Sequence, residues 1–143
     1  MNIYIVAASD AELDAERRLR WGDHWFKQSL GAAVQGLGHT VTENALEADV
    51  VVNCHGARVE RLPEWAFNIL WVIGHPDAVT AAECLEYDAV FAESAEFAAH
   101  IGAVHLPGAS DMMPMNVPIE HDTVFVGNAR PGHGRPCINE LKD

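Results

Sequence analysis

Six short apolar runs recur along the first 106 residues, and polar or helix-forming segments separate each run from the next. The first run, residues 2–8 (NIYIVAA), is apolar nearly throughout, as expected of a parallel strand that is covered on both faces. Strands that alternate with helices predict an α/β fold with a doubly wound, Rossmann-like parallel sheet. The other predicted strands are residues 40–42, 48–54, 67–73, 89–93 and 104–106.

The same pattern predicts the strand order and the helices. Rossmann-like topology with right-handed crossovers favours the strand order 3-2-1-4-5-6. Aspartate often caps the start of a helix and glycine often follows its end, so a helix is predicted between Asp23 and Gly38. Two more helices are predicted over residues 78–87 and 95–101. The predicted buried stripe of the first helix is Phe26, Leu30, Ala33, Val34 and Leu37, and the predicted strand core is Val50, Val51, Val52, Ile69, Leu70, Val72, Val90 and Phe91.

The last third of the chain predicts a change of domain. Residues 107–121 hold three prolines and three methionines, and we interpret them as a crossover linker after a first domain of residues 1–106. Residues 122–143 have the pattern of a strand, a glycine- and proline-rich loop and a helix start, which opens a second α/β domain that is otherwise missing. We expect its apolar VFV strand to fold back or to pair with another copy of the chain, which would give a homodimer.

Composition argues against several classes of protein. Hydrophobic residues make up 49% and charged residues 21% of the 143, which is typical of a globular domain. No run of about 18 apolar residues occurs and no basic segment precedes the first apolar run, so we expect no transmembrane helix, no signal peptide and a cytoplasmic location. Three cysteines without CxxC spacing indicate reduced thiols. The net charge of −12 argues against general nucleic-acid binding.

Positive charge is concentrated early in the sequence. No lysine or arginine occurs between residues 62 and 129, whereas five arginines lie in two segments that follow predicted strands. The carboxyl ends of parallel strands meet at one edge of the sheet, where α/β proteins bind ligands, so both segments are expected there. Two interpretations stay open, a solvated rim and a site for an anionic ligand. The five residues are Arg17, Arg18, Arg20, Arg58 and Arg61.

Three short motifs at this edge suggest chemistry, and each has a plainer alternative. Gly22 and Asp23 lie where a helix start could meet a phosphate, although an ordinary helix cap has the same sequence. His75 and Asp77 place an imidazole and a carboxylate after a strand, which suits a general base, but also a helix cap beside a packed histidine. His55 and His75 raise the question of a metal site, but the histidines show no HxH or HxxxH spacing and we expect no metal.

Several segments together resemble a known family. The segment WGDHWFKQSLGAAVQGLGHTV resembles the opening of bacterial GT-B glycosyltransferases, and WVIGHPD, ECLEYDAVFAES, HLPGASD and VFVGNARPGHGR follow in the order of that family. The sequence looks most like the spore-maturation (CgeB-like) group and the related family-4-type transferases. The resemblance covers nearly the whole chain, and the order of the segments is more specific than any one of them.

The resemblance implies the acceptor-side domain of a nucleotide-sugar-dependent glycosyltransferase, facing a Rossmann-like donor domain across a cleft. It implies no cofactor and no metal, with a nucleotide-sugar as co-substrate and an acceptor of unknown identity. Most of the donor domain would lie beyond Asp143, so we expect the 143-residue chain alone to be inactive. At matching positions, it implies His75 and Asp77 as catalytic candidates, and Arg20, Gly22, Asp23, Glu93, Ser94, Gly127 and Arg130 as candidates for donor binding.

Two other classes of protein share the predicted sheet. A stand-alone flavodoxin-like module, which binds a small ligand or regulates, would have no need of the strand, loop and helix at the end of this sequence. A receiver domain would need an acidic pocket, to which Asp10 could contribute, and a phosphorylatable aspartate that closes the third strand. Asn53 and His55 stand at that position instead, so the receiver interpretation is not favoured.

Overall fold

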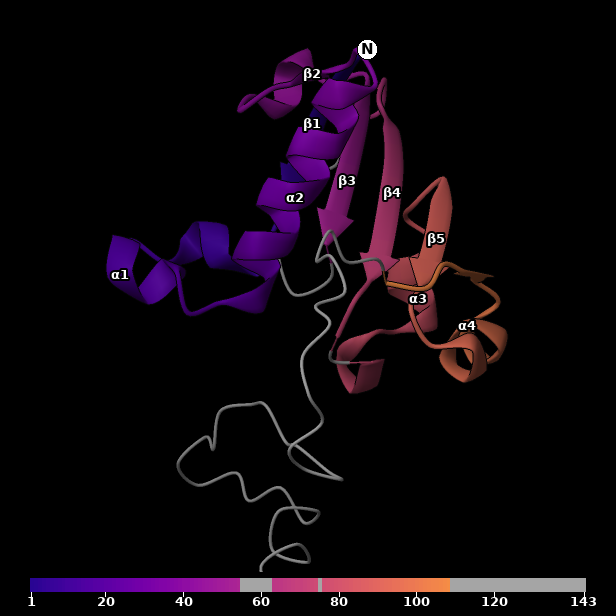
Figure 1. Ribbon diagram of the computed structural model, residues 1–143. Coiled ribbons are helices and arrows are strands. Elements are labelled where there is room, and N and C mark those ends of the chain that lie inside the picture. Colours follow the sequence, from indigo (N-terminus) through magenta and orange to yellow (C-terminus); the bar gives the residue numbers. More distant parts are fainter. Residues whose placement is uncertain (55–62, 75, 109–143) are drawn as a thin grey trace, which may run out of the picture. The chain divides into compact units, whose positions relative to one another are not determined.

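Six parallel strands form a sheet in the computed structural model, which describes residues 1–54, 63–74 and 76–108 (Figure 1). Each neighbouring pair of strands is parallel, in the order β2-β1-β3-β4-β5-β6. The doubly wound α/β fold that the sequence predicts is therefore confirmed. The strands are β1 (Asn2–Val6), β2 (Thr40–Val41), β3 (Val50–Cys54), β4 (Phe67–Val72), β5 (Ala89–Ala92) and β6 (Val104–His105).

The predicted strand order 3-2-1-4-5-6 is wrong, because β3 lies between β1 and β4 while β2 lies at the edge of the sheet. The lengths of the strands give the reason. β2 has two residues and pairs only with the start of β1, so in the interior of the sheet it would leave most backbone groups of its neighbours unpaired. β3 has five residues and pairs along both β1 and β4.

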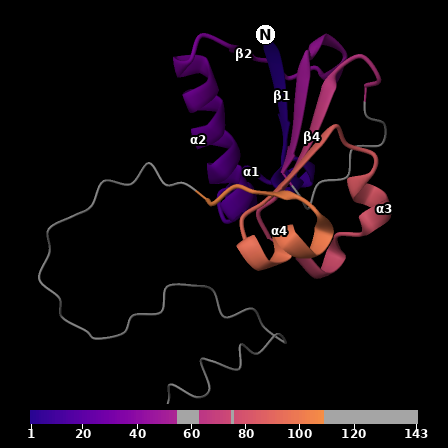
Figure 2. The same ribbon diagram turned by 90° about the vertical axis from the view of Figure 1, so that its right-hand side faces the viewer.

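A long helix covers the β1 side of one face of the sheet (Figure 2). Phe26, Leu30 and Val34 of α2 (Gly22–Gly36) pack against a buried cluster from β1 and β3. Gly38 follows the helix with a φ of 85°, a left-handed conformation that favours glycine, and so ends it as predicted. The last turns of the predicted stripe do not reach the sheet, and its exposed members are Ala33 and Leu37.

Shorter helices cover the opposite face. α3 (Ala81–Cys84) and α4 (Ala95–Ile101) follow β4 and β5 and pack around the fully buried Leu70. The helix predicted over residues 78–87 is shorter than expected, because the Thr80 hydroxyl accepts the Glu83 N–H at 3.1 Å and starts a new helix. Before it, η3 (Pro76–Ala78) forms a separate 3-10 turn.

Three of the residues predicted to form the strand core are buried, and the others are partly exposed. Val51, Leu70 and Val72 are buried. The partly exposed Val50 and Val52 still pack under α2, and Val90 packs beside Leu70. Two further predicted core residues are partly exposed and belong to none of the buried clusters, because α2 packs mainly on β1 and β3 and meets β4 near its end, at Trp71. These two are Ile69 and Phe91.

The connection between β1 and α2 contains two helical turns, η1 (Ala8–Ala11) and α1 (Ala15–Arg18), and η2 (Ala45–Glu47) precedes β3.

The described residues all belong to a unit that spans Met1–Asp111. Most of the predicted linker and the whole predicted second-domain strand lie outside the described residues. In the described ranges, no helix is both long enough and apolar enough to cross a membrane.

Candidate functional site

The carboxyl ends of the six strands meet at one edge of the sheet, and open α/β sheets bind ligands at such an edge. The topological switch point lies between β1 and β3, because α2 leads from β1 to β2 on one side while β3 and β4 continue on the other. Side chains from the loop after β1, from the first half of α2 and from the end of β3 meet there. This switch-point cluster consists of Ser9, Asp10, Asp23, Lys27 and Cys54.

An ion pair fixes the loop after β1 to α2. Lys27 Nζ lies 3.0 Å from both carboxylate oxygens of Asp10, and only 14% of the Lys27 side chain is exposed. The Ala7 N–H donates to Asp10 Oδ2 at 2.9 Å, so the same carboxylate also closes the turn of η1. Because the Lys27 side chain is mostly shielded from solvent while Asp10 is exposed, salt is expected to screen this pair less than an ion pair whose two side chains are both exposed.

A second link joins the same two elements. Ser9 is fully buried, and its N–H donates to Asp23 Oδ2 at 2.8 Å. Asp23 and Lys27 are four residues apart on α2, so they lie on one face of the helix and bind successive residues of the loop. The Ser9 hydroxyl has no hydrogen-bond partner within the described structure.

The role predicted for Asp23 as the cap of α2 is wrong. Trp21 is the N-cap residue, without a side-chain capping bond, and Asp23 lies in the first turn of the helix. Its negative charge interacts favourably with the positive end of the helix dipole. Its carboxylate, however, accepts a hydrogen bond from the Ser9 N–H in the loop after β1. Asp23 therefore acts as a structural link between two elements.

Cys54, the member of the cluster that ends β3, is fully buried. Burial is the main reason why the pKa of the Cys54 thiol is raised to about 12, and the charge of Asp23 comes second. Lys27 opposes the rise and Asp10 adds to it. The thiol is therefore neutral near pH 7 and does not serve as a nucleophile.

The arginine-bearing segment before α2 is held by its own polar contacts. The Asp14 carboxylate caps α1 and accepts from the backbone N–H groups of Glu16 and Arg17. The Arg18 guanidinium donates to the Glu12 carbonyl oxygen from Nε at 3.0 Å and from Nη2 at 2.6 Å. The side chain of Arg18 is therefore committed to the loop and would have to leave it to bind a ligand.

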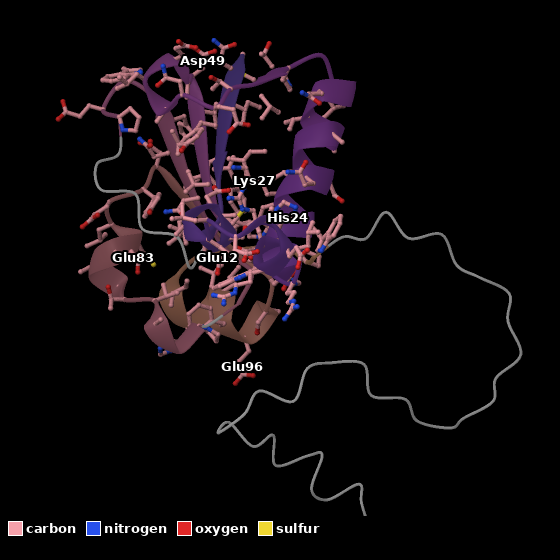
Figure 3. All side chains as sticks on the ribbon, turned by 90° about the vertical axis from the view of Figure 1, so that its left-hand side faces the viewer. Glu12, His24, Lys27, Asp49, Glu83 and Glu96 are labelled. Atoms are coloured by element: carbon pink, nitrogen blue, oxygen red, sulfur yellow. The ribbon has the colours of Figure 1, made fainter. Side chains whose placement is uncertain are left out.

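Carboxylates offset the positive charge of this rim. Figure 3 shows Glu12, His24 and Lys27 toward the same end of the molecule, with Asp49 at the opposite end. Within the described residues the rim has no excess of positive charge, so its net charge alone does not favour an anion. Arg58 and Arg61, also predicted on this rim, lie outside the described residues. The cations are Arg17, Arg18, Arg20 and Lys27, and the carboxylates are Asp10, Glu12, Asp14, Glu16 and Asp23.

The start of α2 leaves room at Gly22. Gly22 is the first residue of the helix and is exposed, and a Cβ added to it would meet no atom within 4 Å. Packing inside the described chain therefore does not require a glycine at this position. Arg20 lies two residues before Gly22, in the turn between α1 and α2, and is exposed.

Glu93 and Ser94 lie at the same edge, after β5. The Ser94 hydroxyl accepts the Phe97 N–H at 3.2 Å and so caps α4. Glu93 is exposed, and its N–H donates to the Val72 carbonyl oxygen at 3.1 Å. A surface hollow of about 530 Å³ runs along α4 beside them, lined by Ser94, Glu96, Phe97, Ala99 and His100.

The structure brings the described candidates to one edge but in two groups. Arg20, Gly22 and Asp23 lie on the β1 side, whereas Glu93 and Ser94 lie beyond β4, at the end of β5. The backbone of Asp77 lies after β4, in η3, between the two groups. The other predicted site residues lie outside the described residues, namely His75, Gly127 and Arg130.

Sequence reasoning missed the switch-point cluster, although a signal for it exists. Lys27 is the single lysine or arginine in α2 and follows Asp23 by four residues, a spacing that places both on one face of a helix.

In the described ranges, no group of three histidine, cysteine, aspartate or glutamate side chains is arranged to hold a metal ion.

No family model matches the chain, and comparisons with curated proteins and with solved structures also gave no match.

Substitution of Asp23 tests whether the cluster holds the loop in place. Asp23→Ala is expected to lower the free energy of unfolding by about 1–2 kcal/mol, because it removes the bond to the Ser9 N–H and a favourable charge in the first helical turn. Urea denaturation followed by circular dichroism measures the change. Asp23→Asn keeps an acceptor oxygen and is expected to lose less. Equal stability of Asp23→Ala and the unsubstituted chain would contradict the role of this link.

Proposed function

We propose that this chain is the acceptor-side domain of a nucleotide-sugar-dependent, GT-B-type glycosyltransferase that acts in the cytoplasm. One observation supports this most. Segments of the sequence that resemble the family are far apart along the chain, and three of them converge on the carboxyl edge of the sheet. They contain Gly22 at the start of α2, Asp77 after β4 and Ser94 after β5.

The proposed chemistry is sugar transfer without a metal. Asp77 or His75 would accept the proton of the acceptor hydroxyl as general base, because both follow β4 at the ligand-binding edge. Arg20 and the first N–H groups of α2 at Gly22 would face the donor diphosphate, whose leaving charge basic side chains and helix N-termini stabilise. Glu93 and Ser94 would line the cleft. Gly127 and Arg130 would contribute from the donor side.

The genomic reading frame that encodes the chain provides the main test. We expect it to continue past Asp143 into a second α/β domain, and its full product to release nucleoside diphosphate from a UDP-, GDP- or dTDP-sugar. Asp77→Asn is expected to slow this release by about 100-fold or more, as removal of a general base does. Glu86→Gln, at an exposed carboxylate of the same region, is the matched control and is expected to leave the rate unchanged.

The 143-residue chain by itself is expected to show no transfer and no saturable binding of nucleotide-sugars, because the proposed donor contacts come mainly from the second domain. Isothermal titration calorimetry with the same panel of sugars measures this. Binding in the micromolar range by this chain would contradict the proposal and would favour a complete small binding protein.

A second candidate function is a flavodoxin-like module that binds a small ligand or regulates. The strand order favours it, since β2-β1-β3-β4-β5 is the flavodoxin-like order and places the switch point between β1 and β3. Such a module would bind its ligand without a second domain. Micromolar binding of a nucleotide-sugar by the chain alone would therefore favour this second candidate.

A further inference from the structure

The α2 side of β4, β5 and β6 carries a continuous row of apolar side chains. The register pairs Trp71 with Phe91 and Phe91 with Val104, and paired residues of parallel strands point to the same face. Because side chains alternate along β4, Phe67 and Ile69 share that face with Trp71. We call these five residues the open face: Phe67, Ile69, Trp71, Phe91 and Val104.

The open face is exposed or partly exposed along its whole width. Phe67 is 50% exposed and Val104 is 59% exposed, and the other three residues are partly exposed. Figure 1 shows α2 alongside β1 and β3, with β4 and β5 beyond them. α2 meets the open face at Trp71, where the Phe26 ring packs edge-on with ring centroids 4.9 Å apart. Strands of a parallel sheet are normally covered on both faces, so an apolar face of this kind is typical of a docking surface.

The open face has the dimensions of one α-helix. β4 and β6 are two strand spacings apart, roughly 10 Å, which is also the diameter of a helix with its side chains. β4 has six residues, so the face is about 20 Å long and matches a helix of about 14 residues. α2 occupies the neighbouring position on β1 and β3, and doubly wound sheets carry helices on each face. A second helix beside α2 therefore fits this surface.

Carboxylates lie at both ends of the open face. Glu86 and Asp88 are exposed at the amino end of β5. Glu93 is exposed at its carboxyl end, where the Glu93 N–H still donates to the Val72 carbonyl oxygen of β4. The described residues 63–74 and 76–108 contain no lysine and no arginine that could offset these charges. The charge around the open face therefore favours a cationic partner.

We propose that the open face is the docking site for an amphipathic helix of a partner protein, with an apolar stripe between lysine or arginine residues. The stripe packs on the open face, and the cations lie toward Glu86, Asp88 and Glu93. A second copy of the chain and an anionic membrane fit less well, because the net charge of −12 repels both. This docking does not depend on the proposed glycosyltransferase function.

A synthetic helix provides the probe. A fluorescein-labelled peptide of about 14 residues, with leucine on one side of the helix and lysine on the other, is titrated with the full chain. We expect the fluorescence anisotropy to report saturable binding in the micromolar range. The same peptide with glutamate in place of every lysine is expected not to bind, because the carboxylates around the open face repel it.

Substitutions on the chain locate the binding. Phe67→Ser is expected to weaken the binding of the lysine peptide about tenfold, because it removes a large apolar contact from the open face. Leu37→Ser is the matched control, since Leu37 is 77% exposed at the end of α2 and outside the open face. We expect it to change the affinity less than about twofold.

A second pair of variants tests the charge. Glu93→Gln is expected to weaken the binding about threefold, whereas Glu43→Gln, at an exposed carboxylate beside β2, is expected to leave it unchanged. Circular dichroism verifies that each variant is folded. The absence of binding, equal losses for Phe67→Ser and Leu37→Ser, or equal binding of the glutamate peptide would each overturn the proposal. A dimer of the chain in light scattering that Phe67→Ser dissociates would also overturn it, since the occupant would then be a second copy.

Discussion

Leu70→Ala is expected to lower the free energy of unfolding by about 3–4 kcal/mol, a large part of the stability of a domain of this size. Leu70 lies in the centre of β4 and is fully buried, where it packs with Val72, Ala92 and Ala98. Removal of its side chain takes apolar contacts from both α3 and α4 and leaves a cavity that the surrounding strands cannot fill. Urea denaturation followed by far-ultraviolet circular dichroism measures the loss.

Leu85→Ala is the matched control, because it deletes the same atoms at a position that is 87% exposed. Its expected effect is within about 0.5 kcal/mol of zero. Similar losses for the two variants would show that the Leu70 cluster is not the core of this face.

The fold class could be predicted from the sequence because it follows from the order of apolar runs and helical segments. Alternating apolar runs and helical segments require a parallel sheet, and all six predicted strands occur. The strand order could not be predicted in the same way. It depends on β2, which has two residues and therefore lies at the edge, and no local pattern shows how far a strand will pair.

Hydrophobicity also failed to separate the covered from the uncovered strand positions. Phe91 and Leu70 are equally apolar in sequence, but Leu70 faces α3 and α4, whereas Phe91 lies on the α2 side of the sheet and belongs to none of the buried clusters. A helix covers only the strands that its crossover passes. The burial of an individual strand residue therefore follows from topology and not from residue type.

The site was predicted in its location but not in its contacts. The carboxyl edge follows from parallel strands alone, so Gly22, Asp77 and Ser94 could be placed there in advance. The partner of Asp23 is Ser9, which is 14 residues earlier in the chain, and the capping preference of aspartate does not reveal a bond of that range. A local rule predicted a cap, and a tertiary contact uses the carboxylate instead.

Alkylation of Cys54 is expected to be roughly a thousandfold slower at pH 8 than that of a thiol with the ordinary pKa of 9.0, because its pKa of about 12 leaves correspondingly less thiolate. Treatment with iodoacetamide followed by peptide mass spectrometry measures the rate. Cys84 is a control in the same chain, since it is only partly buried and its pKa is raised to a smaller degree. In urea both thiols are expected to react at similar rates. Equal rates in the folded protein would contradict the buried environment of Cys54.

The same shift predicts how stability depends on pH. The pKa of Cys54 is higher in the folded state than its unfolded value of 9.0, so the folded state holds the proton more tightly. The protonated Cys54 thiol therefore contributes fully to the free energy of unfolding below about pH 9. This contribution is lost as pH rises from 9 toward 12, by up to about 1.4 kcal/mol per pH unit. Cys54→Ala is expected to flatten this part of the profile, although Cys84 and Tyr87, whose pKa values are also raised, retain a smaller slope. Urea denaturation at pH 8, 9 and 10 gives both profiles. If the two run parallel, the proton on Cys54 is not linked to folding.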